Sequence, residues 1–394
     1  MKIGIIGGGP AGIFAAIEAS KRYTDITIFD KNDFLGRKLS ATGAGRCNLT
    51  NVNVSSVRYR STHDNSFRKL IDHFDYAFLS EYFRNLGIYT YHTDDGWVYP
   101  LSNSARNISL FLENYLNQLK VTIQKNISIV NINKIENKFH LLTDTGKTSQ
   151  FDRLIIASGG KAYPQLNASD EIIQLLEKFG HHYIPAFPAL APIRTTKYET
   201  KSLNGVRLDA MIRIYNNNVE IGKELGNIIF TEWGLNGPGV MNLSHLVRNE
   251  RDLSIEIDLA SVLPESFINS TLANKVNFLL LSTPLLPITN KKIIDQLLVN
   301  SKIKLDSPFR SDDFIQLIKN MKFKEKILGT RDFEFAQVST GGLDSSKINP
   351  ETLESLICPG LYFAGEVLDM FGPCGGYNLH WAFISGIIAG QLKI

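Results

Sequence analysis

The chain has 394 residues, of which 43% are hydrophobic and 21% are charged, so it has the composition of a soluble globular protein and room for two or three domains. The formal net charge of +3 is too small to indicate a nucleic-acid partner or an anionic membrane surface, and no apolar run reaches the ~20 residues that cross a bilayer. Three widely spaced cysteines (Cys47, Cys358 and Cys374) predict no metal site and no disulfide framework. Because the sequence starts directly with a strand, we expect no signal peptide and a cytoplasmic location.

The first predicted element is a short buried strand, KIGII, that ends in a glycine turn. The turn fits G-x-G-x-x-G at Gly7, Gly9 and Gly12, and a helix and a second strand ending in Asp30 follow it. Such glycines allow a tight turn, the approach of backbone to a pyrophosphate and close helix–strand packing, while the acid accepts hydrogen bonds from a ribose. The unit therefore predicts a dinucleotide site. A turn used only for packing would leave Asp30 unexplained.

The next segment, residues 36–51, is a glycine-rich cationic loop with the sequence GRKLSATGAGRCNLTN. In an NAD dehydrogenase another helix–strand unit usually follows the acid, so this loop favours FAD. We expect Arg37 and Lys38 to reach phosphate, and Arg46 and Asn48 to offer donors to a flavin ring. The alternative is a solvated, mobile loop with incidental charge.

The middle of the chain reads as a meander, a return strand and an insertion. The meander starts at VTIQ, and its Ile129 is a candidate for backbone contact with adenine. The return strand, LIIASGG, ends in small residues that let the chain pass close to a cofactor. Residues 189–260 carry strand-like runs with one short helical run, and residues 262–328 have helical spacing, so that the lysine run KNMKFKEK reads as a solvated helix face.

The C-terminal segment combines a buried strand, a glycine loop and a helix. Glu366 follows the strand, where it can bind the hydroxyls of a ribityl chain. The helix N-terminus places the N–H groups of Asn378 and Leu379 where they can stabilise the negative charge of a reduced flavin. Gly386 and Gly390 lie on one helix face and predict the close approach of a neighbouring element.

In this order the motifs resemble the bacterial YhiN/BaiN-type flavoproteins, which are FAD-dependent oxidoreductases of the group with two dinucleotide-binding domains, sometimes described as aminoacetone-oxidase-like. The resemblance runs from residue 1 to residue 394, and its specific blocks are GR-C-N-L-T-N and GGYNL-WA. It implies an α/β fold: a discontinuous Rossmann-like FAD-binding domain (1–188 and 331–394) with an inserted β-domain (189–260) and a helical subdomain (261–330). His380 and Cys374 stand where the family commonly has glutamine and threonine, and LNASDE replaces a glycine-rich stretch.

The resemblance also implies which residues contact FAD. They are Gly7, Gly9, Pro10, Ala11, Gly12, Asp30, Lys31, Arg37, Lys38, Thr42, Gly43, Arg46, Cys47, Asn48, Ile129, Ala157, Ser158, Gly159, Gly365, Glu366, Gly376, Asn378 and Leu379.

The sequence leaves the chemistry partly open. Tyr377, His380 and Cys374 are candidate proton donors, although a packing tyrosine, a structural histidine and a small buried cysteine are the plainer readings. Arg331 and residues 233–236 are weaker candidates for substrate contact. No second complete G-x-G-x-x-G unit appears in the sequence, so NADH or NADPH would act as a transient reductant without its own Rossmann domain.

The leading hypothesis is an FAD oxidoreductase that transfers a hydride between flavin N5 and a small or medium organic substrate. It would reduce a C=C bond conjugated to a carbonyl, or oxidise a C–H next to nitrogen or oxygen. The alternatives are a flavoprotein that acts on or binds tRNA, which the near-neutral charge disfavours, and a noncatalytic flavin carrier or sensor. The oligomeric state is left open.

Overall fold

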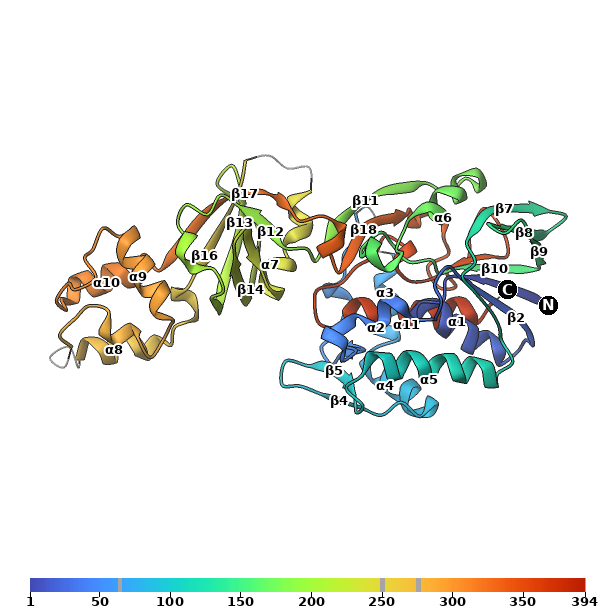
Figure 1. The fold of residues 1–394 in the computed structure, drawn as a ribbon, viewed down its shortest axis with the longest axis horizontal. Helices are drawn as coiled ribbons and strands as arrows, with labels where there is room; N and C mark the ends of the chain where they lie inside the picture. The colour runs from blue at the N-terminus through green and yellow to red at the C-terminus, as the bar shows by residue number, and fades with distance from the viewer. Residues whose placement is uncertain (63–65, 249–251, 274–277, 394) are drawn as a thin grey trace. The chain divides into compact units, whose positions relative to one another are not determined.

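The computed structural model describes residues 1–62, 66–248, 252–273 and 278–393. The chain divides into two compact units (Figure 1): residues 1–187 with 337–394, and residues 188–336. Each unit has its own hydrophobic core. Within the described residues, no helix combines the length and apolar character needed to cross a membrane.

A parallel five-stranded sheet forms the centre of the first unit. Its order is β19-β10-β1-β2-β6, with bounds Leu361–Phe363, Arg153–Ile156, Lys2–Ile6, Asp25–Asp30 and Thr122–Lys125. The inner strands are nearly continuous apolar runs because helices and the meander cover the sheet. The VTIQ segment was expected in the meander. It instead pairs with β2 in the parallel sheet as β6, and the meander consists of β7 (Ile129–Ile135), β8 (Lys138–Thr143) and β9 (Thr148–Phe151).

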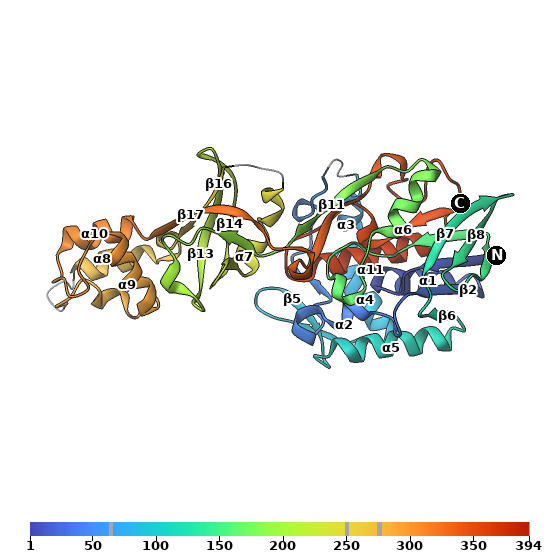
Figure 2. The same cartoon turned by 45° about the horizontal axis from the view of Figure 1, so that its top comes forward.

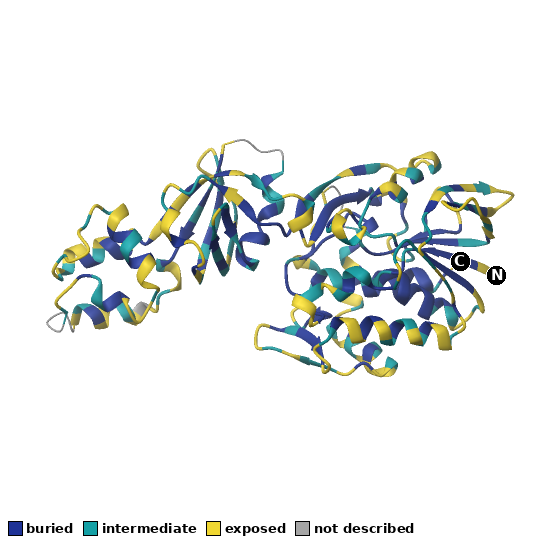
Figure 3. Ribbon diagram, viewed as in Figure 1, coloured by how far each residue is buried: buried dark blue, intermediate teal, exposed yellow. Residues whose placement is uncertain are grey.

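Two nearly all-buried helices, α1 (Pro10–Ser20) and α11 (Tyr377–Gly390), pack side by side in this unit (Figures 2 and 3). A Cβ at Gly386 would lie 2.3 Å from the Ala11 carbonyl oxygen, and one at Gly390 would lie 2.4 Å from that of Ala15. The predicted close approach is therefore confirmed, and the neighbour is α1. Because α1 starts at the glycine turn, this packing ties the N-terminal motif to the C-terminal one.

The remaining elements of the first unit surround this core. They are α2 (Arg37–Ser40), β3 (Thr50–Asn51), α3 (Arg68–His73), α4 (Tyr76–Leu86), β4 (Thr90–His92), β5 (Trp97–Pro100), α5 (Ala105–Gln118), α6 (Glu171–Gln174), β11 (Tyr183–Ala189) and β18 (Val338–Leu343).

The second unit is a closed six-stranded barrel with appended helices. The barrel order is β12-β15-β14-β13-β16-β17, with bounds Ile193–Thr195, Gly234–Asn236, Val219–Thr231, Arg207–Asn216, Leu253–Asp258 and Lys322–Thr330. The described α-helices are α7 (Pro238–Met241), α8 (Glu265–Ala273), α9 (Lys291–Asn300) and α10 (Ser311–Lys319).

The lysine run expected on a helix face lies mostly in a strand, so that expectation is wrong. Lys322, Lys324 and Lys326 point outward from β17, while Phe323 and Glu325 between them are buried. The period is two, as in a half-buried strand, rather than 3.6. The helical part of the insertion therefore ends before β17, which closes the barrel.

Candidate functional site

The three glycines of the N-terminal fingerprint have different surroundings. Gly7 has φ +108°, and a Cβ there would lie 2.3 Å from the Ala157 carbonyl oxygen; a Cβ at Gly12 would lie 1.9 Å from the Gly7 oxygen. Gly9 instead has ordinary extended backbone, with φ −78°, and a Cβ there would meet no described atom within 4 Å. Packing thus requires Gly7 and Gly12, whereas the open space beside Gly9 is available to a ligand.

The acid at the end of β2 is held in a defined orientation. Asp30 accepts hydrogen bonds from the Gly8 N–H (2.6 Å) and from the Asn32 N–H (2.7 Å) and side-chain amide (2.9 Å). Burial raises the pKa of Asp30, and these hydrogen bonds oppose the shift. The neighbouring Lys31 ammonium donates to the Ser169 hydroxyl at 2.7 Å.

The cationic loop winds through a run of left-handed backbone. Gly43, Ala44, Gly45 and Cys47 have φ of 59°, 54°, 86° and 68°. Such runs turn successive N–H groups toward one side and suit an anion or a polar ring edge. Thr42 opens this run, and its hydroxyl donates to the Leu39 carbonyl at 2.7 Å.

The three cationic side chains of this loop have different interaction partners. Lys38 forms an ion pair with Glu366 at 2.8 Å, so the residue expected to reach phosphate and the residue expected to bind the ribityl hydroxyls contact each other directly. Arg37 pairs with Asp33 at 3.1 Å, and the exposed Arg46 lies over the Tyr99 ring, 4.3 Å from its centroid.

Asn48 supports the site through its neighbours. Its amide donates to the carbonyl oxygens of Thr50 (2.9 Å) and Val98 (3.2 Å) and accepts from the Gly376 N–H (3.2 Å). The side chain that was expected to contact the flavin therefore fixes the start of α11. Asn378 acts similarly, accepting from the Gly372 N–H at 2.8 Å and donating to the Gly372 carbonyl at 2.9 Å.

The N-terminus of α11 remains available for a ligand. Gly376 precedes it with φ 95°, and no side chain of the described residues caps it. Its first-turn N–H groups, which include those of Asn378 and Leu379, have no partner within the helix. They carry the partial positive charge that suits a developing anion.

The end of β10 contributes a buried hydroxyl without a protein partner. The Ser158 hydroxyl makes no hydrogen bond to the described residues, although it is shielded from solvent. Gly159 follows with φ 77° and open space where a Cβ would point. Glu366 lies nearby and accepts from the Ser339 N–H at 2.8 Å. An orphaned hydroxyl, an open glycine turn and an uncapped helix together fit a dinucleotide cofactor.

Other expected contacts also lie at or next to the ends of strands and helices in this unit. Ala157 donates its N–H to Ile6 at 2.8 Å, and Gly365 accepts from the Trp381 indole at 3.2 Å. Pro10 and Ala11 start α1, and Ile129 is buried at the start of β7.

Of the candidate proton donors, His380 has both ring nitrogens engaged. Its Nδ1 lies 2.7 Å from the Thr50 hydroxyl, and its Nε2 lies 2.8 Å from the Phe74 carbonyl oxygen. A carbonyl only accepts, so Nε2 carries the proton and Nδ1 accepts from Thr50. Burial lowers the pKa of His380 to about 4, which keeps the ring neutral.

The other two candidates are buried. Tyr377 packs against Tyr59, whose hydroxyl donates to the Tyr377 carbonyl at 2.8 Å. Cys374 is a buried free thiol, as is Cys47, and burial raises the pKa of Cys47 to about 12. Among the described residues, no group of three or more His, Cys, Asp or Glu is placed to hold a metal.

Tyr163 is a residue that sequence reasoning missed. It has left-handed backbone (φ 65°, ψ 59°), which is rare for a bulky residue and common at functional sites. It follows the Gly159–Gly160 pair and is partly exposed, and burial, with a smaller contribution from Cys374, raises its pKa. A tyrosine at this position does not by itself indicate a functional residue in the sequence. Only its left-handed backbone conformation marks it as a candidate.

A family model described as the HI0933-like protein Rossmann domain matches residues 1–392. The chain belongs to the HI0933-like family. This confirms the resemblance inferred from the GR-C-N-L-T-N and GGYNL-WA blocks, and with it the Rossmann-like FAD-binding fold that carries a small β-domain.

Two curated relatives of this HI0933-like protein align along almost the whole chain. The 3-dehydro-bile acid delta(4,6)-reductase of Clostridium scindens is 32% identical over 405 residues, which cover 99% of this chain and 98% of the reductase. The ribosomal RNA dihydrouridine synthase of Haemophilus influenzae is 31% identical over 398 residues, which cover 97% of this chain and 95% of the synthase.

Among solved structures, the 3-ketosteroid-delta4-(5alpha)-dehydrogenase of Rhodococcus jostii RHA1, in complex with 4-androstene-3,17-dione, shares the fold. It aligns with a TM-score of 0.50 at 11% identity, over 100% of this chain and 97% of that chain. The HI0933-like protein is thus an FAD-dependent oxidoreductase.

Proposed function

We propose that this HI0933-like protein reduces a carbon–carbon double bond conjugated to a carbonyl group, with NADH or NADPH as the electron source. The names of the two relatives support this reaction class. The Δ4,6 double bonds of a 3-dehydro steroid are conjugated to its 3-oxo group, and the uridine double bond that is lost in dihydrouridine is conjugated to a ring carbonyl. The two substrates differ in size and charge but share the reacting group.

The observation that carries the proposal is the uncapped N-terminus of α11, together with the open space at Gly9 and Gly159. FAD, when bound, supplies the hydride from N5. The first-turn N–H groups of α11 would stabilise negative charge on the ring, and the space beside Gly9 would admit the pyrophosphate. Asp30 and Glu366 would accept hydrogen bonds from the ribose and ribityl hydroxyls. The Ser158 hydroxyl would gain the partner it lacks in the protein.

Reduction of a conjugated double bond also needs a proton. The hydride adds to the carbon β to the carbonyl and a proton adds to the α carbon, so one nicotinamide hydride and one proton are consumed per double bond. His380 is locked in a neutral tautomer, and the side chains of Tyr377 and Cys374 are buried. We therefore assign proton donation to the partly exposed Tyr163 hydroxyl, which its raised pKa keeps protonated at neutral pH.

The reaction class is tested by visible absorption of the purified protein under anaerobic conditions. Flavin bands near ~450 nm should bleach on addition of NADH or NADPH, and they should recover when a 3-oxo-Δ4 steroid or a uridine-containing RNA is added. Flavin bands that do not bleach with either NADH or NADPH would point to an oxidase or to another electron donor. If denaturation released no flavin even after reconstitution with FAD, the glycine fingerprint would be misassigned.

The proton donor is tested by Tyr163→Phe. Bleaching by the nicotinamide should proceed at the wild-type rate, because that step needs no proton from Tyr163. Recovery of the bands with substrate should slow by about 100-fold, the lower end of the range for loss of a general acid. Tyr89→Phe, at a tyrosine that is 61% exposed, is the matched control and should leave both steps unchanged. Equal slowing of bleaching and recovery would argue against this role.

A further inference from the structure

The carboxylate at the end of β2 is the last group of a hydrogen-bond relay. The Asn32 amide donates to Asp30 Oδ1 at 2.9 Å, and the Asn167 amide donates to Asn32 Oδ1 at 2.9 Å. An ionised carboxylate only accepts, so Asn32 has to turn its NH2 group to Asp30 and its carbonyl oxygen to Asn167. The orientation of Asp30 is therefore connected to a loop that lies 135 residues beyond Asn32 in the chain.

A second contact ties the same two segments together. The Lys31 ammonium, between Asp30 and Asn32 in the chain, donates to the Ser169 hydroxyl at 2.7 Å. Asn167 and Ser169 both belong to the segment LNASDE. Two neighbouring side chains after β2 thus reach this segment through separate hydrogen bonds.

The loop that supplies both contacts has a defined conformation. Tyr163 and Asn167, with φ of 65° and 62°, flank a single 3-10 turn. The far end of the loop is fixed by Asp170, which is 7% exposed and accepts a hydrogen bond from the Tyr183 hydroxyl in β11. Asparagine adopts left-handed backbone more readily than most residues, so Asn167 suits the turn by its backbone as well as by its amide. We call this loop, residues 163–170, the clasp.

Asp30 retains capacity for a ligand within this arrangement. An ionised carboxylate accepts about four hydrogen bonds. The described residues give Asp30 three, of which one reaches Oδ2 from the Gly8 N–H and two reach Oδ1 from Asn32. The relay therefore holds one oxygen of Asp30 and leaves the other able to accept from a ribose hydroxyl.

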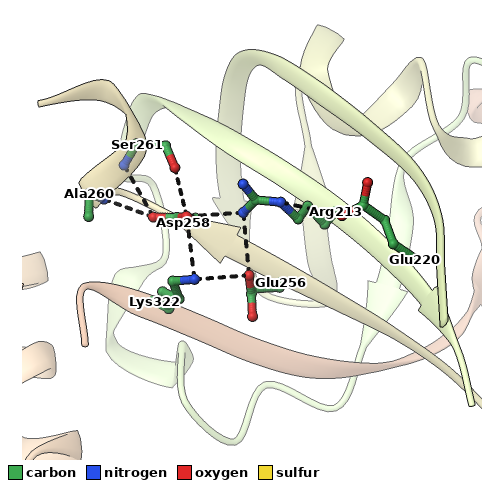
Figure 4. A network of polar contacts seen from close by, with 7 residues as sticks. All are labelled: Arg213, Glu220, Glu256, Asp258, Ala260, Ser261 and Lys322. Carbon is green, nitrogen blue, oxygen red and sulfur yellow. Dashed lines mark hydrogen bonds and ion pairs between the residues drawn. The ribbon is translucent and has the colours of Figure 1, made fainter. Parts of the chain in front are cut away.

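Two polar clusters of the second unit are already satisfied by protein partners. Figure 4 shows Arg213 and Lys322 paired with two carboxylates, with N–O distances between 3.0 and 3.5 Å. Arg331, a weaker sequence candidate for substrate contact, has its guanidinium carbon 3.3 Å from the Phe335 ring centroid and 4.8 Å from that of Trp233. The relay differs from these clusters because it ends on an acceptor that is not yet saturated.

Building on the FAD site of the proposed function, we propose that the clasp determines how tightly the adenosine half of FAD is held, and that Asn167 is a positioning residue that acts through Asn32 on Asp30. The clasp fixes the carboxylate before the ribose arrives, so less orientational freedom is lost on binding. Without the Asn167 amide, Asn32 is free to rotate, and Asp30 loses a donor that sets its direction. The loss then falls on the ribose contact and not on the flavin ring.

The test is calorimetric titration of the flavin-free full-length protein with ADP, which carries the adenosine half of FAD, and with 2′,3′-dideoxy-ADP, which lacks both ribose hydroxyls. Wild type should bind ADP at least about 10-fold more tightly than dideoxy-ADP, because hydrogen bonds to a charged group are lost. Asn167→Gly removes the amide and keeps the left-handed backbone, which glycine adopts freely. This variant should weaken ADP by about 5-fold and leave dideoxy-ADP unchanged. The affinity for FAD, measured by flavin fluorescence, should fall by the same factor as that for ADP.

Two comparisons separate this role from a general loss of structure. Asn137→Gly makes the same substitution at an exposed asparagine with φ 64° in the hairpin between β7 and β8, and it should change neither nucleotide affinity. In an Asn32→Ala background, which already lacks the middle of the relay, Asn167→Gly should have no further effect on ADP.

Three results would overturn the proposal. Wild type that binds ADP and dideoxy-ADP equally would show that Asp30 does not hold the ribose. Asn167→Gly that keeps the wild-type preference for ADP, or that weakens both nucleotides alike, would show that the clasp is only a structural loop. None of these results bears on the reaction class, because bleaching and recovery of the flavin bands report the reaction itself.

Discussion

At the scale of single residues, the glycine fingerprint separates into packing positions and one ligand position. Gly7 and Gly12 are required by the protein itself, because a Cβ at either would overlap backbone oxygen. Gly9 is not required in this way: its backbone is extended and its surroundings are open. The sequence motif predicted a separate role for each glycine, and the surroundings of the three positions differ in the way that those roles require.

Gly9→Val should therefore abolish retention of FAD without unfolding the protein. The valine side chain would occupy the space assigned to the pyrophosphate, and the affinity for FAD should fall at least ~100-fold, a loss of about 3 kcal/mol. Flavin absorbance after gel filtration and thermal unfolding of the flavin-free protein measure the two properties. Gly12→Ala is the contrasting variant and should lower stability even without FAD. Stoichiometric FAD in Gly9→Val would refute the assigned fingerprint.

At the scale of elements, α11 is the element on which the candidate site depends. Gly386 and Gly390 seat it against α1, Asn48 holds the N–H of Gly376, and His380 links it to Thr50 and Phe74. These contacts come from segments more than 300 residues apart in the chain. They place the first turn of α11 without using its remaining free N–H groups.

The buried His380 should make stability depend on acid pH. Its pKa in the fold is about 4, below the ordinary value of 6.5, so the unfolded state binds more protons between these values and the free energy of unfolding falls as pH falls. The contribution of His380 is complete above pH 6.5, and about 3 kcal/mol is lost on going down to pH 4.

Replacement by glutamine should remove this contribution while leaving the FAD domain folded. Urea unfolding of wild type and His380→Gln at pH 7 and at pH 4 measures the difference. His181, whose pKa burial also lowers to about 4, remains in the variant, so a smaller acid dependence should persist. An unchanged pH dependence in His380→Gln would show that the fold does not lower the pKa of His380.

At the scale of the whole molecule, two separate hydrophobic cores support two compact units. One core is built around the parallel sheet with α1 and α11, and the other fills the barrel and the helices appended to it. The cofactor contacts predicted from sequence all lie in the first unit, and so does the clasp. The insertion therefore has the means to fold independently of the cofactor domain.

A fragment of residues 188–336 should fold by itself and bind no flavin. It contains every residue of the second core and all six strands of the barrel. A cooperative thermal transition by circular dichroism, with dispersed amide signals in its NMR spectrum, would be the expected result. A fragment that binds hydrophobic dyes and melts without a cooperative transition would show that the unit needs the FAD domain in order to fold.

Local patterns in the sequence were sufficient to predict the nucleotide-binding unit of the cofactor fold, whereas the residues that contact FAD stay a prediction. Glycines, an acid at a strand end and long apolar runs report short-range requirements, so the Rossmann-like unit and the close approach of the C-terminal helix to a neighbouring element could be predicted from them. The interruption of the FAD domain was instead implied by the family resemblance. The strand at Lys322–Thr330 was missed because Lys319, Lys322 and Lys326 also stand at helical spacing, and the buried Glu325 was counted as an exposed polar residue.

What only the tertiary structure decided is the partner of each polar side chain. Asn48 and His380 looked like cofactor contacts, but their partners are distant backbone groups and a hydroxyl, which no local pattern encodes. Tyr163 became a candidate only through its left-handed backbone, and Asn167 only through the loop that brings its amide to Asn32. Hydrogen bonding, backbone strain and charge pairing depend on long-range geometry, and the fold alone supplies it.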